Sequence, residues 1–213
     1  CILYNLNTKP ICYIFSGWYD ENGSNVTEIG SDATGDKSYT ARWTPITYTV
    51  AFDANGGEGN MANQTFAYDV EQSLAANTFT RAGYDFAGWS DTQDGNVVYT
   101  DQDAVNNLTD VDGTVITLYA RWTPITYTVA FNVNGGNGEM DNQDFIYGEE
   151  QALPPNTFTR TGYTFAGWSE TPDGNVVYAD QDAVKNLTAI SNGTVTLYAQ
   201  WTPIAYTVTF DAN

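Results

Sequence analysis

The sequence predicts an α+β fold, rich in β-strands, in which small sheet domains repeat in tandem. Three observations favour this class. The segment 46–124 returns as 125–203, and the two copies differ at only 26 of 79 positions, which indicates tandem duplication. Apolar and polar residues alternate in several short segments of each copy, as in half-buried strands. One stretch in each copy has the start signal and apolar face of a short helix.

The duplication predicts four parts. Residues 1–45 are an incomplete N-terminal repeat, 46–124 and 125–203 are full repeats, and 204–213 are the first strand of a further repeat. The chain lacks an initial Met and stops within a repeat, so we interpret it as a piece of a longer polypeptide. Proline follows each closing strand without a Gly/Ser-rich spacer. Adjacent domains are therefore expected to hold a narrow range of angles, as an elongated rod.

The strands of a full repeat are expected in a fixed order. Residues 47–53 and 64–68 alternate as strands on either side of an Asn-Gly-Gly turn. The heptapeptide 83–89 forms the next strand, and an Asp-Gly-Asn turn leads from it to 97–99. A last alternating strand is expected at 116–122.

A short helix is expected before the last strand. Asp101 is placed to cap its first turn, and the helix would extend through Leu108. Ala104, Val105 and Leu108 would share its buried face. This helix, packed on one face of the sheet, is what makes the predicted class α+β. In the incomplete repeat, a first strand is expected at 2–7.

The heptapeptide 83–89 supplies most of the predicted core. Its first two aromatic residues lie two apart and face the same side of a strand, and a glycine lets the backbone bend before the tryptophan. A buried aromatic ring contributes on the order of 4–6 kcal/mol gross. A core strand is therefore favoured over a ligand-stacking platform. The predicted structural core consists of Tyr84, Phe86, Trp89, Trp122, Tyr163, Phe165, Trp168 and Trp201.

The composition excludes several classes of function. The net charge is −19, because 26 Asp and Glu face only 7 Lys and Arg. Such a chain is not expected to bind nucleic acid or to dock on anionic membranes. No apolar run is long enough for a transmembrane helix. Histidine is absent, which removes the commonest general base and metal ligand.

Acidic residues cluster near a turn glycine in both full repeats. Carboxylates beside such a glycine are typical of calcium loops, but this spacing does not match an EF-hand. A solvated turn with a helix cap is the favoured interpretation, and a glycosidase pair lacks any positioning motif. No catalytic residue and no cofactor are predicted. The weak calcium candidates are Asp91, Asp94, Asp101, Asp103, Asp173, Asp180 and Asp182.

Two further features leave alternatives open. Several tyrosines could stack on sugars if they are exposed, although cross-strand packing is the commoner role of strand tyrosines. Cys1 and Cys12 are the two cysteines, and a bridge between them is one option. The tyrosines concerned are Tyr99, Tyr119, Tyr178 and Tyr198.

Three motifs, in this order, resemble the Listeria–Bacteroides repeat family, which includes the B repeat of bacterial internalins. They are 127–136, 162–168 and 197–202, with the same motifs in the other full repeat and a worn version in 11–45. The resemblance implies a β-grasp-like fold in tandem arrays. It also implies that the repeats belong to a large secreted or surface-anchored bacterial protein and that they carry no catalytic residues.

The expected function is a non-enzymatic stalk or spacer of a bacterial adhesin-like protein. The expected location is extracellular, at the cell surface or cell wall. Binding of a host protein or glycan is expected from domains outside this fragment, and no membrane insertion is expected within it. The alternative is a ligand-binding surface module that uses exposed aromatics. Strand-mediated self-association through 204–213 is a further hypothesis.

Overall fold

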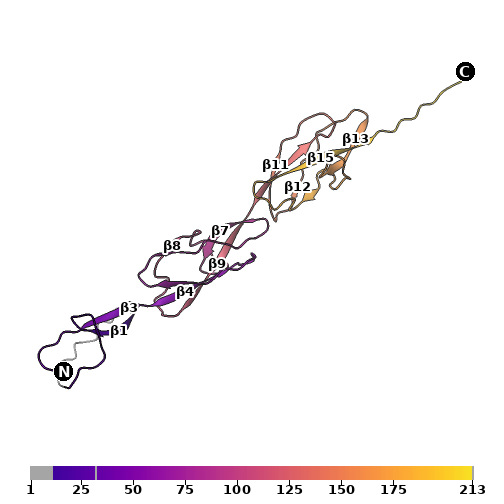
Figure 1. Cartoon of the computed structure of the whole chain (residues 1–213). Coiled ribbons are helices and arrows are strands. Elements are labelled where there is room, and N and C mark those ends of the chain that lie inside the picture. Colours follow the sequence, from indigo (N-terminus) through magenta and orange to yellow (C-terminus); the bar gives the residue numbers. More distant parts are fainter. Residues whose placement is uncertain (1–11, 32, 213) are drawn as a thin grey trace. The chain divides into compact units, whose positions relative to one another are not determined.

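The computed structural model describes residues 12–31 and 33–212. This part of the chain contains 15 strands and no helix (Figure 1). No helix that could span a membrane is therefore present in it. The strand expected at 2–7 lies outside the described residues.

Contacts divide the chain into two compact units, which are described separately. Unit 1 comprises Cys1–Phe79 and Ala87–Arg121, and unit 2 comprises Thr80–Phe86 and Trp122–Asn213. The division falls inside the first full repeat. Residues 80–86 include the start of the heptapeptide strand. Their contacts group them with the second full repeat.

Unit 1 begins with a small antiparallel sheet built from the incomplete repeat. Its strand order is β2-β1-β3, with β1 (Tyr13–Tyr19), β2 (Asn25–Val26) and β3 (Thr40–Pro45). The register of β1 against β3 shifts between Phe15 and Gly17, which marks a β-bulge. β1, whose sequence is a worn version of the heptapeptide 83–89, thus pairs antiparallel with its closing strand, β3.

The first full repeat forms a four-stranded sheet with the order β5-β4-β9-β7. β4 pairs antiparallel with β5 and parallel with β9, so the first and last strands of the repeat are neighbours. The strand bounds are β4 (Thr47–Asp53), β5 (Gln64–Ala67), β7 (Tyr84–Ser90) and β9 (Val115–Pro124). These four elements match the expected strands closely, and the alternation in each explains why.

Unit 2 contains the same sheet as β11-β10-β15-β13, together with a two-stranded ribbon of β12 and β14. β10 is again parallel to β15, and β13 is antiparallel to β15 with a bulge between Phe165 and Gly167. The strands are β10 (Thr126–Asn132), β11 (Gln143–Ile146), β12 (Gln151–Ala152), β13 (Tyr163–Ser169), β14 (Ala183–Val184) and β15 (Thr194–Pro203).

The helix expected at 101–108 does not form. Gln102 and Asn107 have φ angles of 59° and 53°, in the left-handed region, which a right-handed helix does not accommodate. Between them, β8 (Ala104–Val105) pairs antiparallel with β6 (Gln72–Ser73). Of the apolar residues that predicted a buried helix face, Val105 is buried on the ribbon strand and Leu108 is half-buried beyond it, whereas Ala104 is exposed.

The predicted α+β class is wrong for the described residues, which are all-β. The Asp101 carboxylate does not cap a helix but accepts a hydrogen bond from the Asn77 backbone N–H, at 2.8 Å. The Leu108 N–H lies 3.4 Å from the Tyr48 hydroxyl rather than in a helical turn. The expected β-grasp-like domain included that helix, so it is corrected to an all-β module in which a short ribbon covers the sheet.

Candidate functional site

The heptapeptide tryptophans lie at the centre of the two full repeats. Trp89 and Trp168 are completely buried. The φ angles of Gly88 and Gly167 are 136° and 139°, values that L-residues rarely adopt. A Cβ on Gly167 would also lie 2.6 Å from the Tyr178 carbonyl oxygen. The glycine thus permits both the bulge and the close approach that turn the tryptophan onto the same face as the preceding phenylalanine.

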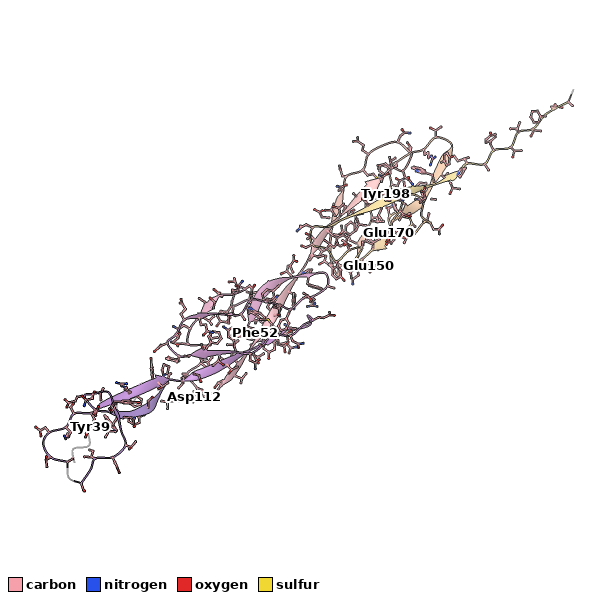
Figure 2. All side chains as sticks on the ribbon, viewed as in Figure 1. Tyr39, Phe52, Asp112, Glu150, Glu170 and Tyr198 are labelled. Atoms are coloured by element: carbon pink, nitrogen blue, oxygen red, sulfur yellow. The ribbon has the colours of Figure 1, made fainter. Side chains whose placement is uncertain are left out.

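Each buried tryptophan is covered by rings from elsewhere in its repeat. In unit 2, Phe131 on β10 and Phe158 contact Trp168, with ring centroids 5.0 and 6.0 Å apart. In unit 1, Phe52 lies 4.9 Å from Trp89 and within the body of the repeat (Figure 2). The first strand of a repeat therefore closes the core over the heptapeptide strand.

The other predicted core residues are half-buried. Tyr84 and Phe86 keep partial exposure, and so does Trp122. Phe86 and Trp122 meet edge to face at 5.6 Å. In the second full repeat, Tyr163, Phe165 and Trp201 are half-buried in the same way, and Phe165 lies 5.8 Å from Trp201.

A hydrogen-bonded joint links the incomplete repeat to the first full repeat within unit 1. We call it joint 1, formed by Cys12, Tyr13, Ile46, Tyr68 and Asp69. The Ile46 N–H donates to the Cys12 carbonyl at 3.0 Å, and the Tyr68 N–H donates to the Ile46 carbonyl at 2.9 Å. The Tyr13 hydroxyl donates to the Asp69 carboxylate at 2.8 Å. The joint is thus a continuation of backbone pairing rather than a free linker.

The same joint recurs within unit 2. We call it joint 2, formed by Gly83, Tyr84, Ile125, Tyr147 and Gly148. The Ile125 N–H donates to the Gly83 carbonyl at 3.0 Å, and the Tyr147 N–H donates to the Ile125 carbonyl at 2.9 Å. Tyr84 packs edge to face on Tyr147 at 5.8 Å. A Cβ on Gly83 would collide with the Tyr147 ring, so this glycine lets the two repeats approach.

Two asparagines that the sequence reasoning missed complete the joints. The Asn107 side-chain oxygen accepts from the Asp69 N–H, and that of Asn186 accepts from the Gly148 N–H, both at 2.6 Å. Hydrogen bonds from Asn107 and from Tyr13 hold the pKa of the Asp69 carboxyl below its usual value. The available signal was an asparagine at the same position of both copies, a residue type that tolerates positive φ.

The asparagines of the predicted Asn-Gly-Gly turns fix the turn after the first strand through long-range hydrogen bonds. The Asn134 amide donates to the Pro172 and Ala199 carbonyls, at 2.7 and 2.9 Å. Asn55 makes the corresponding two bonds in the first full repeat. The Asn-Gly-Gly pattern predicted the turn, and the left-handed φ of Asn134, 45°, agrees with it. The long-range bonds of the amide have no sequence signal.

The acidic residues of the two clusters either accept hydrogen bonds from backbone N–H groups or lie exposed on the surface. Asp180 accepts from the Asn156 N–H at 2.8 Å, as Asp101 accepts from Asn77. The carboxylates of Asp103 and Asp182 accept from backbone N–H groups three residues earlier. Within 12–31 and 33–212, no three acidic or cysteine side chains gather closely enough to hold a metal ion. The remaining calcium candidates, Asp91, Asp94 and Asp173, are exposed.

The tyrosines considered above as sugar-stacking residues are half-buried. Burial, together with a 2.8 Å hydrogen bond from the Tyr178 hydroxyl to Glu170, raises the pKa of Tyr178 to about 12. Burial, with the nearby Asp91, also raises the pKa of Tyr99. Glu170 lies on the surface (Figure 2). The half-buried tyrosines are Tyr99, Tyr119, Tyr178 and Tyr198.

Cys12 belongs to joint 1. Its thiol is buried, and a hydrogen bond with it raises the pKa of Tyr68. Cys1 lies outside the described residues. The Cys1–Cys12 bridge that the sequence left open therefore lies outside them as well.

Known proteins share this arrangement of motifs. Residues 48–121 and 127–200 each match the Listeria-Bacteroides repeat domain. Internalin H of Listeria monocytogenes is 31% identical over 165 residues, which cover 74% of this chain and 26% of that protein.

Two proteins of Evansella cellulosilytica are also similar. One is described as a Gly-rich membrane protein and is 30% identical over 225 residues, or 97% of this chain and 24% of that protein. The other, described as a membrane protein, is 27% identical over 210 residues, or 93% of this chain and 28% of that protein. The chain therefore spans about a quarter of the length of the relatives it matches.

Proposed function

The chain belongs to the Listeria-Bacteroides repeat family, and from this premise we propose that it is a non-enzymatic spacer. In this proposal the repeats form part of the stalk of an adhesin-like bacterial protein, outside the cell and attached to its surface or wall. The stalk separates a binding domain from the cell and transmits load between them. The named relatives, an internalin and two membrane proteins, support a surface location.

The parallel pairing of first and last strands carries the proposal. Load enters a full repeat at its first strand and leaves at its last, for example β10 and β15 in the second repeat. These two strands are hydrogen-bonded neighbours, paired from Thr128 with Thr194 to Asn132 with Tyr198. Because they are parallel, pulling the two ends apart shears the whole ladder at once instead of opening it bond by bond. Such a repeat should resist extension.

The joints add a second argument. In a spacer, load must pass from one repeat to the next without a slack segment. Joints 1 and 2 hold the incoming strand by a backbone bond to the preceding hairpin, and Ile204 repeats that bond to the Gly162 carbonyl at 2.9 Å. The strongly acidic composition, with a net charge of −19, discourages clumping of neighbouring stalks.

The alternative, a ligand-binding module with an exposed aromatic row, receives less support. Of the four tryptophans in the full repeats, Trp89 and Trp168 are completely buried and serve packing, and Trp122 and Trp201 are half-buried. The strand tyrosines are half-buried rather than displayed. Binding of a host protein or glycan is therefore proposed for other domains of the parent protein.

Single-molecule pulling of the 213-residue chain by its ends tests the spacer proposal. We expect two discrete unfolding events, each releasing about 25 nm, the length of roughly 79 extended residues. Thr128→Pro should lower the unfolding force of one event. The substitution removes the bond from the Thr128 N–H to the Gly193 carbonyl, which has a length of 2.9 Å.

The unaltered first full repeat in the same molecule is the control, and its event should keep its force. Thr49→Pro should reverse the pattern, because Thr49 donates the matching bond to the Thr114 carbonyl at 2.9 Å. Gradual extension at low force, or an unchanged pattern in both variants, would contradict the load-bearing role.

A further inference from the structure

The two methionines of the chain occupy the same position in the two full repeats. Met61 and Met140 lie one repeat spacing apart in the sequence, and each side chain is half-buried. A methionine thioether is apolar and packs well in a core, but oxidants convert it into a polar sulfoxide. What these side chains touch therefore decides what oxidation does to a repeat.

The segment just before Met140 is fastened to the chain around Phe158. The Asn137 N–H donates to the Thr159 carbonyl at 2.7 Å, and the Thr159 N–H donates back to the Asn137 carbonyl at 2.9 Å. The next residue, Gly138, lies so close that a Cβ on it would be 3.5 Å from the Phe158 ring. The residues that lead into Met140 are thus packed on a ring of the core.

The Met140 side chain itself packs against the core of the second full repeat. It is one of the half-buried apolar side chains on the buried cluster that contains Phe158 and Trp168. The rings of Phe131 and Phe158 meet Trp168 at 5.0 and 6.0 Å. Met140 lines one hollow together with both of these phenylalanines. The methionine therefore adjoins the two rings that enclose the tryptophan.

This hollow gives small solutes access to Met140. It has a volume of about 350 Å³ and is open to solvent. A water molecule takes up only about 30 Å³ of the liquid, and hydrogen peroxide is little larger than water. Glu139 and Asp141 also line the hollow, so an uncharged oxidant enters it more readily than an anionic one. Hydrogen peroxide can thus reach the methionine while the repeat stays folded.

We propose that Met140 is a site of oxidative modification by hydrogen peroxide, and that its sulfoxide loosens the cover over Trp168. The thioether sulfur attacks one oxygen of the peroxide, so a sulfur–oxygen bond forms and the O–O bond breaks. The sulfur loses two electrons and the peroxide gains them. The second peroxide oxygen takes the remaining proton and leaves as water, and no other reactant is consumed.

The sulfoxide destabilises the repeat because its oxygen is polar. Left among the rings of Phe131 and Phe158, this oxygen is deprived of water. Turned toward the solvent, it draws the side chain away from the same rings. In the unfolded chain the sulfoxide is hydrated at no such cost. The folded repeat therefore becomes less stable after oxidation in either case.

The first full repeat should respond in the same way through Met61. A Cβ on Gly59 would lie 3.6 Å from the Phe79 ring, as one on Gly138 would lie from Phe158. Met61 therefore follows a segment that is packed on the matching phenylalanine. Each repeat thus has its own oxidation site, and each can serve as the control for the other.

Hydrogen exchange of peroxide-treated chains tests this inference independently of the spacer function. In the full-length Met61→Leu variant, Met140 is the remaining methionine. Peroxide should then speed amide exchange in β13 about fivefold or more, and leave β4 unchanged. In Met140→Leu the pattern should reverse, with faster exchange in β4 and unchanged exchange in β13. Leucine is close to methionine in volume and has no sulfur, so both variants should fold.

The double variant Met61→Leu/Met140→Leu is the matched control, because it keeps Cys12 and every tryptophan. Its exchange should not respond to peroxide. Peptide mass spectrometry follows the added oxygen, and methionine sulfoxide reductases with a dithiol should remove it and restore protection of β13.

Four results would overturn the proposal. One is a Met140 that stays unoxidised while the repeat is folded, and another is complete oxidation of Met140 without faster exchange in β13. A double variant that responds to peroxide as the parent chain does would also contradict it. So would fast exchange that persists after the added oxygen has been removed.

Discussion

The heptapeptide strand of the incomplete repeat and that of the second full repeat have the same local structure but different surroundings. β1 and β13 both pair antiparallel with their closing strands, and both have a bulge before a glycine, Gly17 or Gly167. Trp18 is nevertheless 39% exposed, whereas Trp168 is completely buried. The hairpin and its bulge are therefore local properties, and burial of the tryptophan depends on distant segments.

The difference shows which segments those are. In the second full repeat, Phe131 from the first strand and Phe158 from the segment before the heptapeptide enclose Trp168. In the incomplete repeat, Phe15 meets the rings of Trp18 and Trp43 among the described residues, and these lie on β1 and its partner β3. In the full repeats, the first strand thus supplies one of the rings that enclose the tryptophan.

Removal of the tryptophan should have the largest effect and should separate the two contexts. Trp168→Ala should lower the free energy of unfolding of the second full repeat by about 3–5 kcal/mol, because it leaves a cavity among buried rings. Trp18→Ala should cost much less, because its ring already contacts water. Chemical denaturation of both variants measures this, and equal losses would break the comparison.

Alanine at the bulge glycine should have the next largest effect. Gly167→Ala forces a side chain into a φ of 139° and against the Tyr178 carbonyl oxygen, at an expected cost of about 2–4 kcal/mol. Gly17→Ala incurs the same strain at a φ of 132°, but its Cβ meets the Asn25 side chain, which can move. Thermal unfolding should therefore show a smaller shift for Gly17→Ala, and the reverse order would contradict the backbone argument.

Loss of the Asn134 amide should have an intermediate effect confined to the second full repeat. Asn134→Ala removes bonds to the Pro172 and Ala199 carbonyls, and we expect a cost of about 1–3 kcal/mol. Asn55→Ala should do the same to the first full repeat. Hydrogen exchange resolved by segment should show each variant loosening its own repeat, and loosening of both alike would argue against two separate clamps.

Alkaline pH should give the smallest effect, through Tyr178, the tyrosine that bridges to the buried tryptophan. The pKa of Tyr178 is raised from 10.0 to about 12 in the folded state, so its stabilising contribution is complete below about pH 10 and lost as pH rises to about 12. The incomplete repeat has Val26 opposite its tryptophan, where the full repeat has Tyr178. Tyr178→Phe should remove that tyrosine's part of the loss.

A companion variant sharpens the alkaline prediction. Glu170→Asp copies the shorter acid that the first full repeat carries at the same position, Asp91. It should lower the pKa of Tyr178, because burial remains but the hydrogen bond from its hydroxyl is weakened. Ultraviolet titration of the tyrosine hydroxyls measures this pKa directly. An unchanged titration curve would mean that burial alone raises the pKa of Tyr178.

Most of the sheet could be predicted from sequence because its strands alternate. The expected strand 47–53 has the bounds of β4, and 116–122 lies within β9. The ribbon could not be predicted. Ala104, Val105 and Leu108 have a helical spacing, and two-residue strands such as β8 carry no periodicity of their own. Long-range pairing with β6, together with positive φ on either side, decides the conformation there.

The candidate site was predictable in part for a similar reason. Trp89 and Trp168 lie at the centre of the core, and this position agrees with the pattern around them. The joints were foreseen only as short connections marked by proline. Their asparagines, Asn107 and Asn186, bond to residues 38 positions away, and no local pattern encodes such a contact.

Residue-resolved hydrogen exchange on the native chain tests the central claim most directly, because it measures the heptapeptide strand in both contexts at once. If the first strand encloses the module, amides in β13 should exchange only through global unfolding of the repeat. Amides in β1 should then exchange faster by a factor of about 100 or more. Equal protection of β1 and β13 would contradict the account, because the open hairpin would then be as stable as the enclosed module.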